Sequence, residues 1–340
     1  MLIRSPTIKD VANTAGVSIA TVSNVIRGKS TLFSDPTGER VRHAIRELNY
    51  NPNHTARSLV SQSTKTLGVV VPKNHGRLTS NTYLSAMMDG FLEFSVAAGY
   101  QTKIISLVND DKRTAIALVE DGSTDGVALL APPEESPLLS WIHKTRIPTV
   151  VAGNIPPDLE LPSVDVDDIS ACCEAVSWLI SMGHRKIGLI TGDLSQWSSR
   201  RRESGYRRAL DRAGILFNSE IVFQGDYNPP SGEAGSQYFM RIKDRVTAIF
   251  CANDWMALGA MLKFQKNSVR VPEDISIIGF DDIQIAQWTA PTLTTMHQPI
   301  HEIGMKVAEM LIEQIQTGSL SQSSILLPAT LVIRQSVQQI

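Results

Sequence analysis

The sequence predicts an α-helical headpiece with a helix-turn-helix, followed by an α/β body made of two doubly wound lobes, each built on a parallel sheet. Two observations support this architecture. The first 52 residues contain three short helical patterns, and the rest of the chain alternates short β-branched runs with helical patterns. The chain has 340 residues, and the part that follows the headpiece is long enough for two lobes of ordinary size.

The first two helices are expected within residues 7–26, whose sequence is TIKDVANTAGVSIATVSNVI. Thr7 is a good N-cap, and Asp10 completes a capping pair three residues later. Gly16 would end the first helix by adopting the left-handed conformation. The second helix would begin after Ser18, another N-cap, and stop at Gly28. On this pattern alone, an ordinary helical hairpin remains the alternative to a helix-turn-helix.

In a helix-turn-helix, residues near the start of the second helix meet the edges of bases in the major groove. The candidate DNA-contacting side chains of the helix pair are Thr7, Ser18, Ile19, Ala20, Thr21, Ser23, Asn24 and Arg27. Ile19 and Ala20 would offer mainly apolar contact, for instance to thymine methyl groups.

A third helix is expected to open at Ser34 or Asp35, with Pro36 in its first turn, and to end at the turn 49–52. Its buried stripe would consist of Val41, Ala44, Ile45 and Leu48. Three short helices form a small DNA-binding headpiece, which we assign to residues 1–52.

The distribution of charge agrees with this assignment. Residues 1–65 carry nine Lys and Arg against four Asp and Glu, a net charge of +5, and because the whole chain carries −2 the remainder carries −7. A basic head on an acidic body indicates that only the head meets a polyanion such as DNA, since phosphate neutralisation supplies much of the affinity.

The segment TIKDVANTAGVSIATVSNVIRG, followed by ELNYNPNHTARSL, resembles the headpiece and hinge of the LacI/GalR (lactose-repressor) family, and the resemblance extends more loosely over nearly all of the chain. It implies that the hinge, residues 53–65, folds into a helix on operator DNA and that two hinges of a dimer wedge leucines into the minor groove. The hinge candidates are Asn53, Ala56, Arg57 and the wedge Leu59. An apolar wedge can kink a base step, and a leucine that packs the linker onto the body is the alternative.

Two positions depart from the family pattern. Family members usually carry Arg, Lys or His where Asn24 stands, and often Asn where Arg27 stands. Asn can read adenine through two hydrogen bonds and Arg can read guanine, so we expect an altered base preference rather than a loss of binding.

The body, residues 66–340, contains the β-branched runs expected of parallel strands, at 67–72, 102–108, 125–131, 148–153, 186–191, 246–252 and 275–280. The Pro-rich break at 155–162 and the segment 291–299 are expected crossovers between lobes. This pattern resembles the family's periplasmic-binding-protein-like core, which implies a ligand cleft between two lobes. We expect the N-lobe at about 66–162 and 294–320, and the C-lobe at about 163–293 and 321–340.

Ligands of such open sheets bind beyond the carboxyl ends of the strands, so polar residues just after strands are candidates. By resemblance, the family's effector contacts correspond to Arg202, Asn253 and Asp281, with Tyr83 at the rim of the N-lobe. Trp197 could stack on a sugar face. The full candidate set is Tyr83, Ser195, Trp197, Arg202, Asn253 and Asp281. Helix capping is the expected role of the neighbouring Asp254 and Asp282. Trp197, Trp255 and Trp288 are less certain ligand contacts, because a tryptophan more often lies in the core.

Catalysis has little support in the sequence. The carboxylates Asp165, Asp167 and Asp168 precede a helix, where capping is the simpler role. The chain has no P-loop, G-x-G-x-x-G, G-x-S-x-G or H-E-x-x-H motif. His297 and His301 are four apart, but Pro299 disrupts the helix face that a metal site would need. We therefore expect no catalytic residue, no metal and no cofactor.

An exported sugar-binding transport protein would share the fold, but the N-terminus has no apolar signal core and no segment is long enough to span a membrane. The three cysteines, Cys172, Cys173 and Cys251, are odd in number, and two are adjacent. These observations favour a reducing cytoplasm.

The sequence therefore predicts a transcriptional regulator, most simply a repressor, that binds a pseudo-palindromic operator in double-stranded DNA as a homodimer. A small metabolite between the lobes would act as allosteric effector: a sugar, sugar acid, sugar phosphate, or a nucleoside or purine. The expected dimer surface is an N-lobe helix carrying Leu84, Met87, Met88, Phe91 and Phe94, part of which must be core. The alternative is a carbohydrate-binding protein or an enzyme on the same fold.

Overall fold

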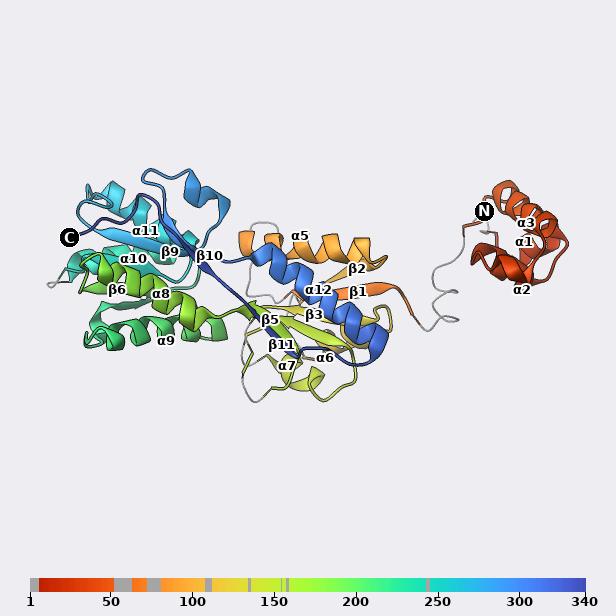
Figure 1. The fold of residues 1–340 in the computed structure, drawn as a ribbon, viewed down its shortest axis with the longest axis horizontal. Coiled ribbons are helices and arrows are strands. Elements are labelled where there is room, and N and C mark those ends of the chain that lie inside the picture. The colour runs from red at the N-terminus through yellow and green to blue at the C-terminus, as the bar shows by residue number, and fades with distance from the viewer. Residues whose placement is uncertain are drawn as a thin grey trace. The chain divides into compact units, whose positions relative to one another are not determined.

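The computed structural model describes residues 6–51, 63–71, 81–107, 112–133, 136–153, 155–156, 159–242 and 245–340. The chain divides into two compact units, Met1–Thr64 and Lys65–Ile340, both drawn in Figure 1. The second unit begins one residue before the body that the sequence predicts. The hinge candidates Asn53, Ala56, Arg57 and Leu59 lie outside the described residues.

The first unit contains the three predicted helices, with bounds α1 Ile8–Ala15, α2 Ile19–Ile26 and α3 Asp35–Glu47, and a short 3-10 turn, η1 Ser30–Leu32. Thr7 and Asp10 form the predicted capping box of α1, and Gly16 ends that helix at φ 64°. The side chain of Ser18 accepts from the N–H of Thr21 as the N-cap of α2. Local capping therefore sets both ends of the turn between the two helices.

A single apolar cluster holds the three helices together. Its buried members come from all three, namely Val11, Ala12, Ala15, Val22, Val25, Val41 and Ala44. Ile26, Ile45 and Leu48 are partly buried against it. The buried stripe that the sequence predicts for the third helix is confirmed, and the face of α2 opposite Val22 and Val25 is left to the solvent.

The N-lobe is a six-stranded parallel sheet in the order β11-β5-β4-β3-β1-β2. The strands are β1 Thr66–Val71, β2 Gln101–Ser106, β3 Gly126–Leu130, β4 Thr149–Ala152, β5 Ser163–Val166 and β11 Ser324–Leu327. Its helices are α5 Thr82–Ala97, α6 Lys112–Glu120, α7 Pro137–Ile142 and α12 Ile300–Thr317. Figure 1 shows α5 and α12 on one face of the sheet and α6 and α7 on the other, which is the doubly wound arrangement that the sequence predicts.

The C-lobe sheet has the order β12-β10-β9-β8-β6-β7, and among its described strands only the pair β10 and β12 is antiparallel. The strands are β6 Ile187–Thr191, β7 Val222–Gln224, β8 Ala248–Cys251, β9 Ser276–Asp281, β10 Thr294–His297 and β12 Thr330–Val332. The helices are α8 Asp168–Ser181, α9 Trp197–Arg212, α10 Pro229–Arg241 and α11 Asp254–Lys266, with the 3-10 turns η4 Ser219–Ile221 and η5 Gln284–Gln287. All seven β-branched runs of the sequence are strands of one sheet or the other.

The pairing of three strands corrects the predicted lobe boundaries. β5 and β11 pair with each other in the N-lobe sheet, although the sequence suggested the C-lobe for both. β10 pairs with β9 in the C-lobe, whereas we expected the N-lobe. The crossovers therefore follow β5, β10 and β11 rather than precede them, because strand pairing decides which lobe a segment joins and the prolines mark only where a strand stops.

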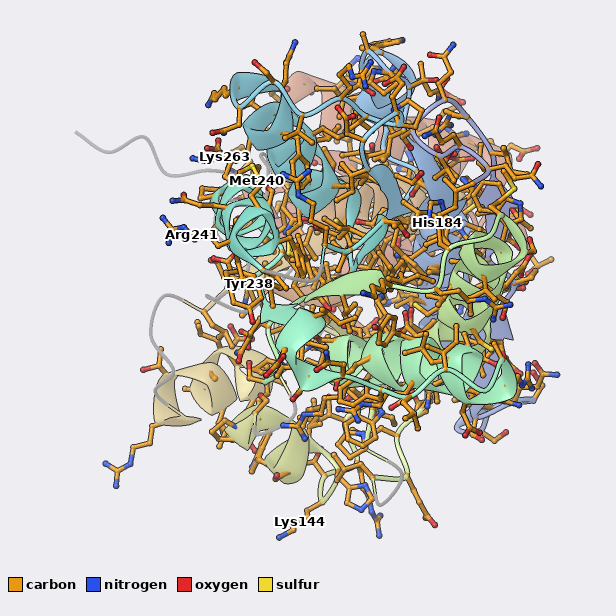
Figure 2. All side chains as sticks on the ribbon, turned by 90° about the vertical axis from the view of Figure 1, so that its left-hand side faces the viewer. Lys144, His184, Tyr238, Met240, Arg241 and Lys263 are labelled. Carbon is orange, nitrogen blue, oxygen red and sulfur yellow. The ribbon has the colours of Figure 1, made fainter. Side chains whose placement is uncertain are left out.

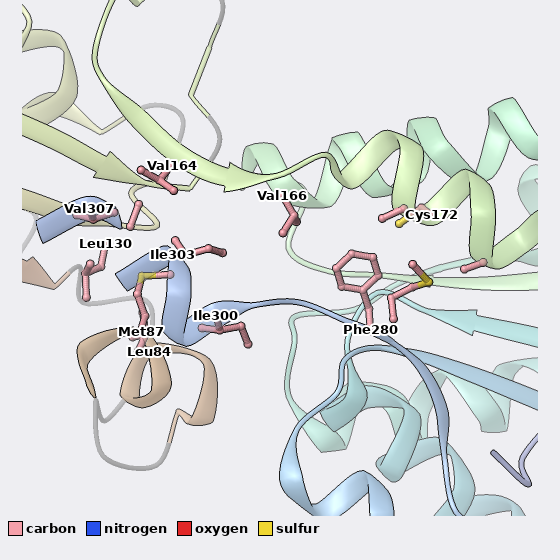
Figure 3. Close-up of a cluster of buried hydrophobic side chains, with 14 of the residues drawn as sticks. Leu84, Met87, Leu130, Val164, Val166, Cys172, Phe280, Ile300, Ile303 and Val307 are labelled. Atoms are coloured by element: carbon pink, nitrogen blue, oxygen red, sulfur yellow. The ribbon is translucent and has the colours of Figure 1, made fainter. Parts of the chain in front are cut away.

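The apolar stripe of α5 is core rather than an exposed surface. Leu84, Met87, Met88 and Phe91 are at most 6% exposed, and Figure 3 shows Leu84 and Met87 beside Ile300, Ile303 and Val307 of α12. A Cβ on Gly90 would lie 1.9 Å from the carbonyl oxygen of His301, and one on Gly304 would lie 2.0 Å from that of Met87. The backbones of α5 and α12 approach so closely that this stripe cannot meet a partner, and that part of the predicted dimer surface is wrong.

The C-terminal residues are tied to the C-lobe through His184, which Figure 2 labels. Its Nε2–H donates to the carbonyl of Gln338 at 3.1 Å, and its Nδ1 lies 2.9 Å from Thr247 Oγ1. His184 is 1% exposed, and burial lowers its pKa. The neutral imidazole is therefore the form that fits this site.

Candidate functional site

The solvent face of α2 and its C-cap carry most of the DNA-contacting residues that the sequence predicts for the first two helices. Ile19 is 47% exposed, Ala20 and Arg27 are exposed, and Thr21, Ser23 and Asn24 are half-buried. Ile19 is the first residue of this eight-residue helix, and an exposed aliphatic side chain at that place could contact a thymine methyl group. The face offers two apolar residues, small hydroxyls, an amide and a guanidinium, which together suit base edges and phosphates.

Three predicted contact residues already have partners inside the headpiece. The hydroxyl of Thr7 donates to Asp10 Oδ2 at 2.7 Å, and the hydroxyls of Ser18 and Thr21 lie 2.9 Å apart. The primary role of Thr7 and Ser18 in the described residues is therefore to cap helices. Within the described part of the headpiece, neither Asn24 nor Arg27 makes a side-chain hydrogen bond of this kind.

In the body, a buried ion pair lies beside the carboxyl ends of the C-lobe strands. Arg202 of α9 donates through Nε to Asp168 Oδ1 at 2.8 Å and through Nη1 to the carbonyl of Ala252 at 2.5 Å. The same Nη1 lies 3.8 Å from Asp281 Oδ1. Arg202 and Asp168 are 6% and 0% exposed, so each charge depends on the other. Two of the predicted effector residues, Arg202 and Asp281, are thus neighbours.

Asp281 ends β9 in a strained backbone. Its φ is 122°, and that of Asp282 is 60°, values that non-glycine residues rarely adopt. Gln298 donates to Asp281 Oδ1 at 2.6 Å. Burial raises the pKa of Asp281 to about 7, and the Arg202 guanidinium counteracts part of that shift. Strain of this kind concentrates at binding sites, where it aims a side chain.

The first turn of α5, in the N-lobe, lies near the Arg202–Asp281 cluster. Tyr83 is partly buried, and burial is the main cause of its raised pKa, with the carboxylates of Asp165, Asp168 and Asp281 acting in the same direction. One residue earlier, Thr82 Oγ1 accepts from Trp255 Nε1 of α11 at 3.1 Å. The predicted effector residues therefore come from both lobes: Tyr83 from the N-lobe, and Arg202 and Asp281 from the C-lobe.

Tyr227 is a member of this cluster that the sequence analysis missed. Its ring centroid lies 5.9 Å from the Arg202 guanidinium, and its hydroxyl lies 3.2 Å from Ser198 Oγ. A Cβ on Gly192 would come within 2.0 Å of the ring, so the ring fits only over a glycine. A sequence signal was present, because Tyr227 lies three residues after the end of β7 in the segment GDYNPP, and ligands of such sheets bind beyond the carboxyl ends of the strands.

The other predicted effector residues are placed less favourably. Asn253 caps α11, where its Oδ1 accepts from Met256 N–H and its Nδ2 donates to the carbonyl of Tyr227. Both ends of the amide are occupied, so Asn253 shapes the site rather than offering a free group. Ser195 is exposed, with its N–H bonded to Asp193, and Trp197 begins α9 in a half-buried position.

Asp254 and Asp282, which we expected to cap helices, instead bind side chains and backbone groups of other segments. Asp254 accepts from Ile283 N–H at 2.9 Å and from Thr295 Oγ1 at 2.5 Å, which joins α11 to the end of β9 and to β10. Asp282 pairs with Arg334 and with His297. Asp167 does cap α8, as predicted. Trp288 is 72% exposed, so it lies outside the core.

Within the described ranges, no group of three or more His, Cys, Asp or Glu side chains is arranged to hold a metal ion. The two histidines that the sequence analysis considered make separate carboxylate contacts: His297 lies 3.2 Å from Asp282, and His301 lies 3.1 Å from Glu93. Over the same residues, none of the helices has both the length and the apolarity that crossing a bilayer requires.

Comparison with known proteins covers nearly the whole chain. The family model for bacterial regulatory proteins of the lacI family matches residues 7–53, and the model for a periplasmic binding protein-like domain matches residues 176–337. The HTH-type transcriptional repressor PurR of Aliivibrio salmonicida (strain LFI1238) is 34% identical over 337 residues, 98% of this chain and 99% of that protein. The HTH-type transcriptional repressor CytR of Escherichia coli (strain K12) is 34% identical over 98% of this chain and 96% of its own length.

Among solved structures, the lac repressor dimer bound to operator and the anti-inducer ONPF has a TM-score of 0.88 at 26% identity and covers 98% of this chain and 100% of its own. The complex of the transcriptional regulator CelR with cellobiose has a TM-score of 0.75 at 30% identity and covers 97% and 99%. With these matches, the helix-turn-helix and the two-lobed body make the protein a DNA-binding transcriptional regulator controlled by small-molecule effectors. The chain belongs to the lacI family of bacterial regulatory proteins.

Proposed function

We propose that the chain is a repressor that acts in the cytoplasm and reads operator DNA through the solvent face of α2. The observation that carries the proposal is the exposed set at the start of that helix, where Ile19 is 47% exposed beside the exposed Ala20. Both would meet thymine methyl groups, while Asn24 and Arg27 would add hydrogen bonds to base edges. Thr21 and Ser23 would add short-range polar contacts from the same face.

The hinge would complete the DNA contact. Asn53, Ala56, Arg57 and Leu59 are proposed to enter the minor groove as a short helix when operator DNA is bound, with Leu59 as the apolar wedge. Arg57 would act on phosphates or groove edges and so strengthen binding to many sequences about equally. The support for these roles is the family membership together with the sequence ELNYNPNHTARSL.

The proposed effector site lies where Tyr83 of the N-lobe approaches Arg202 and Asp281 of the C-lobe. Arg202 supplies donors, Asp281 supplies an acceptor, and Tyr227 supplies a ring face beside the guanidinium. This combination suits a ring-shaped metabolite with several hydroxyl or N–H groups, such as a sugar, a sugar derivative or a nucleoside. CelR, whose structure was solved with cellobiose, is a relative with a sugar ligand.

We favour binding over catalysis for this site because its charged groups are already paired or hydrogen-bonded within the protein. Asp168 neutralises Arg202 at 2.8 Å, and Gln298 holds Asp281 at 2.6 Å. A general acid or base needs to be free to exchange a proton with a substrate. Ser195 and Trp197 stay proposals at the edge of the site, and Asn253 is proposed to act by holding the carbonyl of Tyr227.

A homodimer is proposed for the assembly, since the lac repressor was solved as a dimer on its operator. Several large apolar side chains of the body are exposed: Val96 at 68%, Ile104 at 52%, Leu262 at 44%, Ile285 at 40% and Trp288 at 72%. They belong to α5, β2, α11 and the turn η5, of which Trp288 is the C-cap. In Figure 1, α5 and α11 lie along the upper side of the body. These residues replace the buried α5 stripe as the proposed dimer surface.

Two experiments test the proposal. Selection from random duplex DNA with the full chain should enrich an inverted repeat, and the body alone, residues 65–340, should enrich nothing because it lacks the headpiece. A thermal-shift screen against neutral sugars, sugar acids, sugar phosphates, nucleosides and purines should find a stabilising ligand for both proteins, since a ligand of the folded state raises its stability by mass action. Enrichment of the same sequences by both proteins would contradict the DNA-binding role of the headpiece.

A further inference from the structure

Lys65 is the first residue of the body, whose compact unit spans Lys65–Ile340. Neighbouring segments hold both of its backbone polar groups. Its N–H donates to Asp125 Oδ2 at 3.0 Å, and its carbonyl accepts from Gln101 N–H at 2.8 Å. Asp125 also donates its own N–H to the carbonyl of Thr66 at 2.8 Å. One aspartate therefore fixes two successive residues at the point where the chain enters the N-lobe sheet.

The side chain of Lys65 is fixed as well. Its Nζ lies 4.3 Å from the centroid of the Tyr100 ring and donates to the Tyr100 hydroxyl at 3.3 Å. Tyr100 is only 3% exposed and so forms a rigid platform, whereas Lys65 itself is exposed. An exposed lysine is normally a mobile side chain, and a cation held over a ring gives up that freedom for an attraction of moderate strength.

The backbone of Lys65 is left-handed, with φ at 52°. Residues other than glycine adopt this conformation infrequently. Beginning β1 does not require it, because an extended residue would continue the strand equally well. Asp125, Gln101 and Tyr100 hold Lys65 in this unfavourable conformation. A strained backbone that the surrounding structure maintains indicates a functional role for the bend.

We propose that Lys65, held by Asp125 and Tyr100, is a positioning residue that fixes the direction in which the chain leaves the body toward the DNA-binding headpiece. The inference rests on the proposed function. Two headpieces on one operator gain affinity from their effective concentration. A linker whose first residue is free samples more directions, so the second headpiece reaches its half-site less often.

The test uses Asp125 because a conservative variant and a matched control are both available. Asp125→Ala removes the acceptor of the Lys65 N–H, whereas Asp125→Asn keeps an acceptor oxygen. Asp121→Ala is the control, since Asp121 precedes β3 in the same loop and binds Lys103 Nζ at 2.6 Å. Operator affinity is measured by fluorescence anisotropy on the duplex that the wild-type full chain enriches, and the thermal midpoint of each full-length variant is measured alongside.

We expect Asp125→Ala to weaken operator affinity about tenfold, and Asp125→Asn and Asp121→Ala to weaken it less than about threefold, with similar thermal midpoints for the two alanine variants. A second pair of variants leaves Asp125 intact: Lys65→Met should weaken operator affinity more than its control, Lys103→Met. Equal losses for a variant and its control, or losses that only follow thermal stability, would overturn the positioning role. Failure of the wild-type chain to enrich any duplex would instead overturn the proposed function, and this inference with it.

Discussion

Arg202 organises the proposed effector site at the level of single residues. It donates hydrogen bonds to Asp168 and to the carbonyl of Ala252, and its Nη1 lies 3.8 Å from Asp281 Oδ1. Its guanidinium lies 4.0 Å from the centroid of the Phe280 ring. A guanidinium that is 6% exposed is stable only while a carboxylate balances it, because isolated buried charge is costly. The site is therefore rigid around Arg202.

Removal of the carboxylate partner tests this dependence. Asp168→Ala should destabilise the body by about 3–5 kcal/mol, because it leaves the buried Arg202 uncompensated. Glu203→Ala is the control, since it breaks the partly exposed pair with Arg207 and should cost less than about 1 kcal/mol. Urea unfolding of the two variants measures both effects. Equal losses would show that Arg202 is better solvated than its burial indicates.

Asp281 predicts a pH dependence of stability. Its pKa is raised to about 7 from an ordinary 3.8, mainly by burial, so between these values the folded chain binds more protons than the unfolded chain. Linkage then requires the contribution of this group to the free energy of unfolding to fall as pH rises through that window. Asp281→Asn removes the ionisation, so the variant should gain on the order of 2 kcal/mol relative to wild type between about pH 5 and about pH 8. A pH-independent difference in urea unfolding would contradict the raised pKa.

Individual site residues were predictable only in part. Position after a strand identified Asp281 correctly as a member of the buried cluster, and the same rule could have identified Tyr227. It could not show that both polar ends of Asn253 are used in capping α11 and holding Tyr227. Such pairings depend on which strands are neighbours, and no local pattern in the sequence encodes that.

At the scale of elements, the headpiece helices were predicted best because their ends are set locally. The Thr7–Asp10 box and the left-handed Gly16 act within a few residues of the helix that they delimit. The crossovers were predicted less well, because the assignment of β5, β10 and β11 depends on pairing between segments far apart in the chain. β5 pairs with a strand more than 150 residues later.

The close packing of α5 on α12 makes a sharp prediction for one glycine. Gly90→Ala would place its Cβ 1.9 Å from the carbonyl oxygen of His301, so the helices must separate and stability should fall by about 1–3 kcal/mol. Ala97→Ser, on the exposed end of the same helix, should change stability by less than about 0.5 kcal/mol. Thermal unfolding of both variants provides the comparison, and a neutral Gly90→Ala would mean that the helices are farther apart than described.

For the whole molecule, the proposed dimer depends on the exposed apolar set that includes Trp288. Trp288→Glu should weaken dimerisation at least about tenfold, because a charge would be buried in the interface. Leu216→Glu is the control, since Leu216 is 93% exposed but lies in the loop after α9, on none of the elements that carry that set. Sedimentation velocity over a concentration series measures both. Unchanged dimerisation of Trp288→Glu would move the interface elsewhere.

The central claim is that α2 reads operator sequence and that Asn24 is one of its readers. The most direct measurement is selection from random duplex DNA with the full-length wild type and with Asn24→Ala in parallel. We expect the wild type to enrich an inverted repeat, and the variant to enrich the same repeat with preference relaxed at one symmetric pair of positions, at a cost of about 1–3 kcal/mol for the original base. A wild type that enriches no repeat, or a variant whose preferences are identical at every position, would contradict the account.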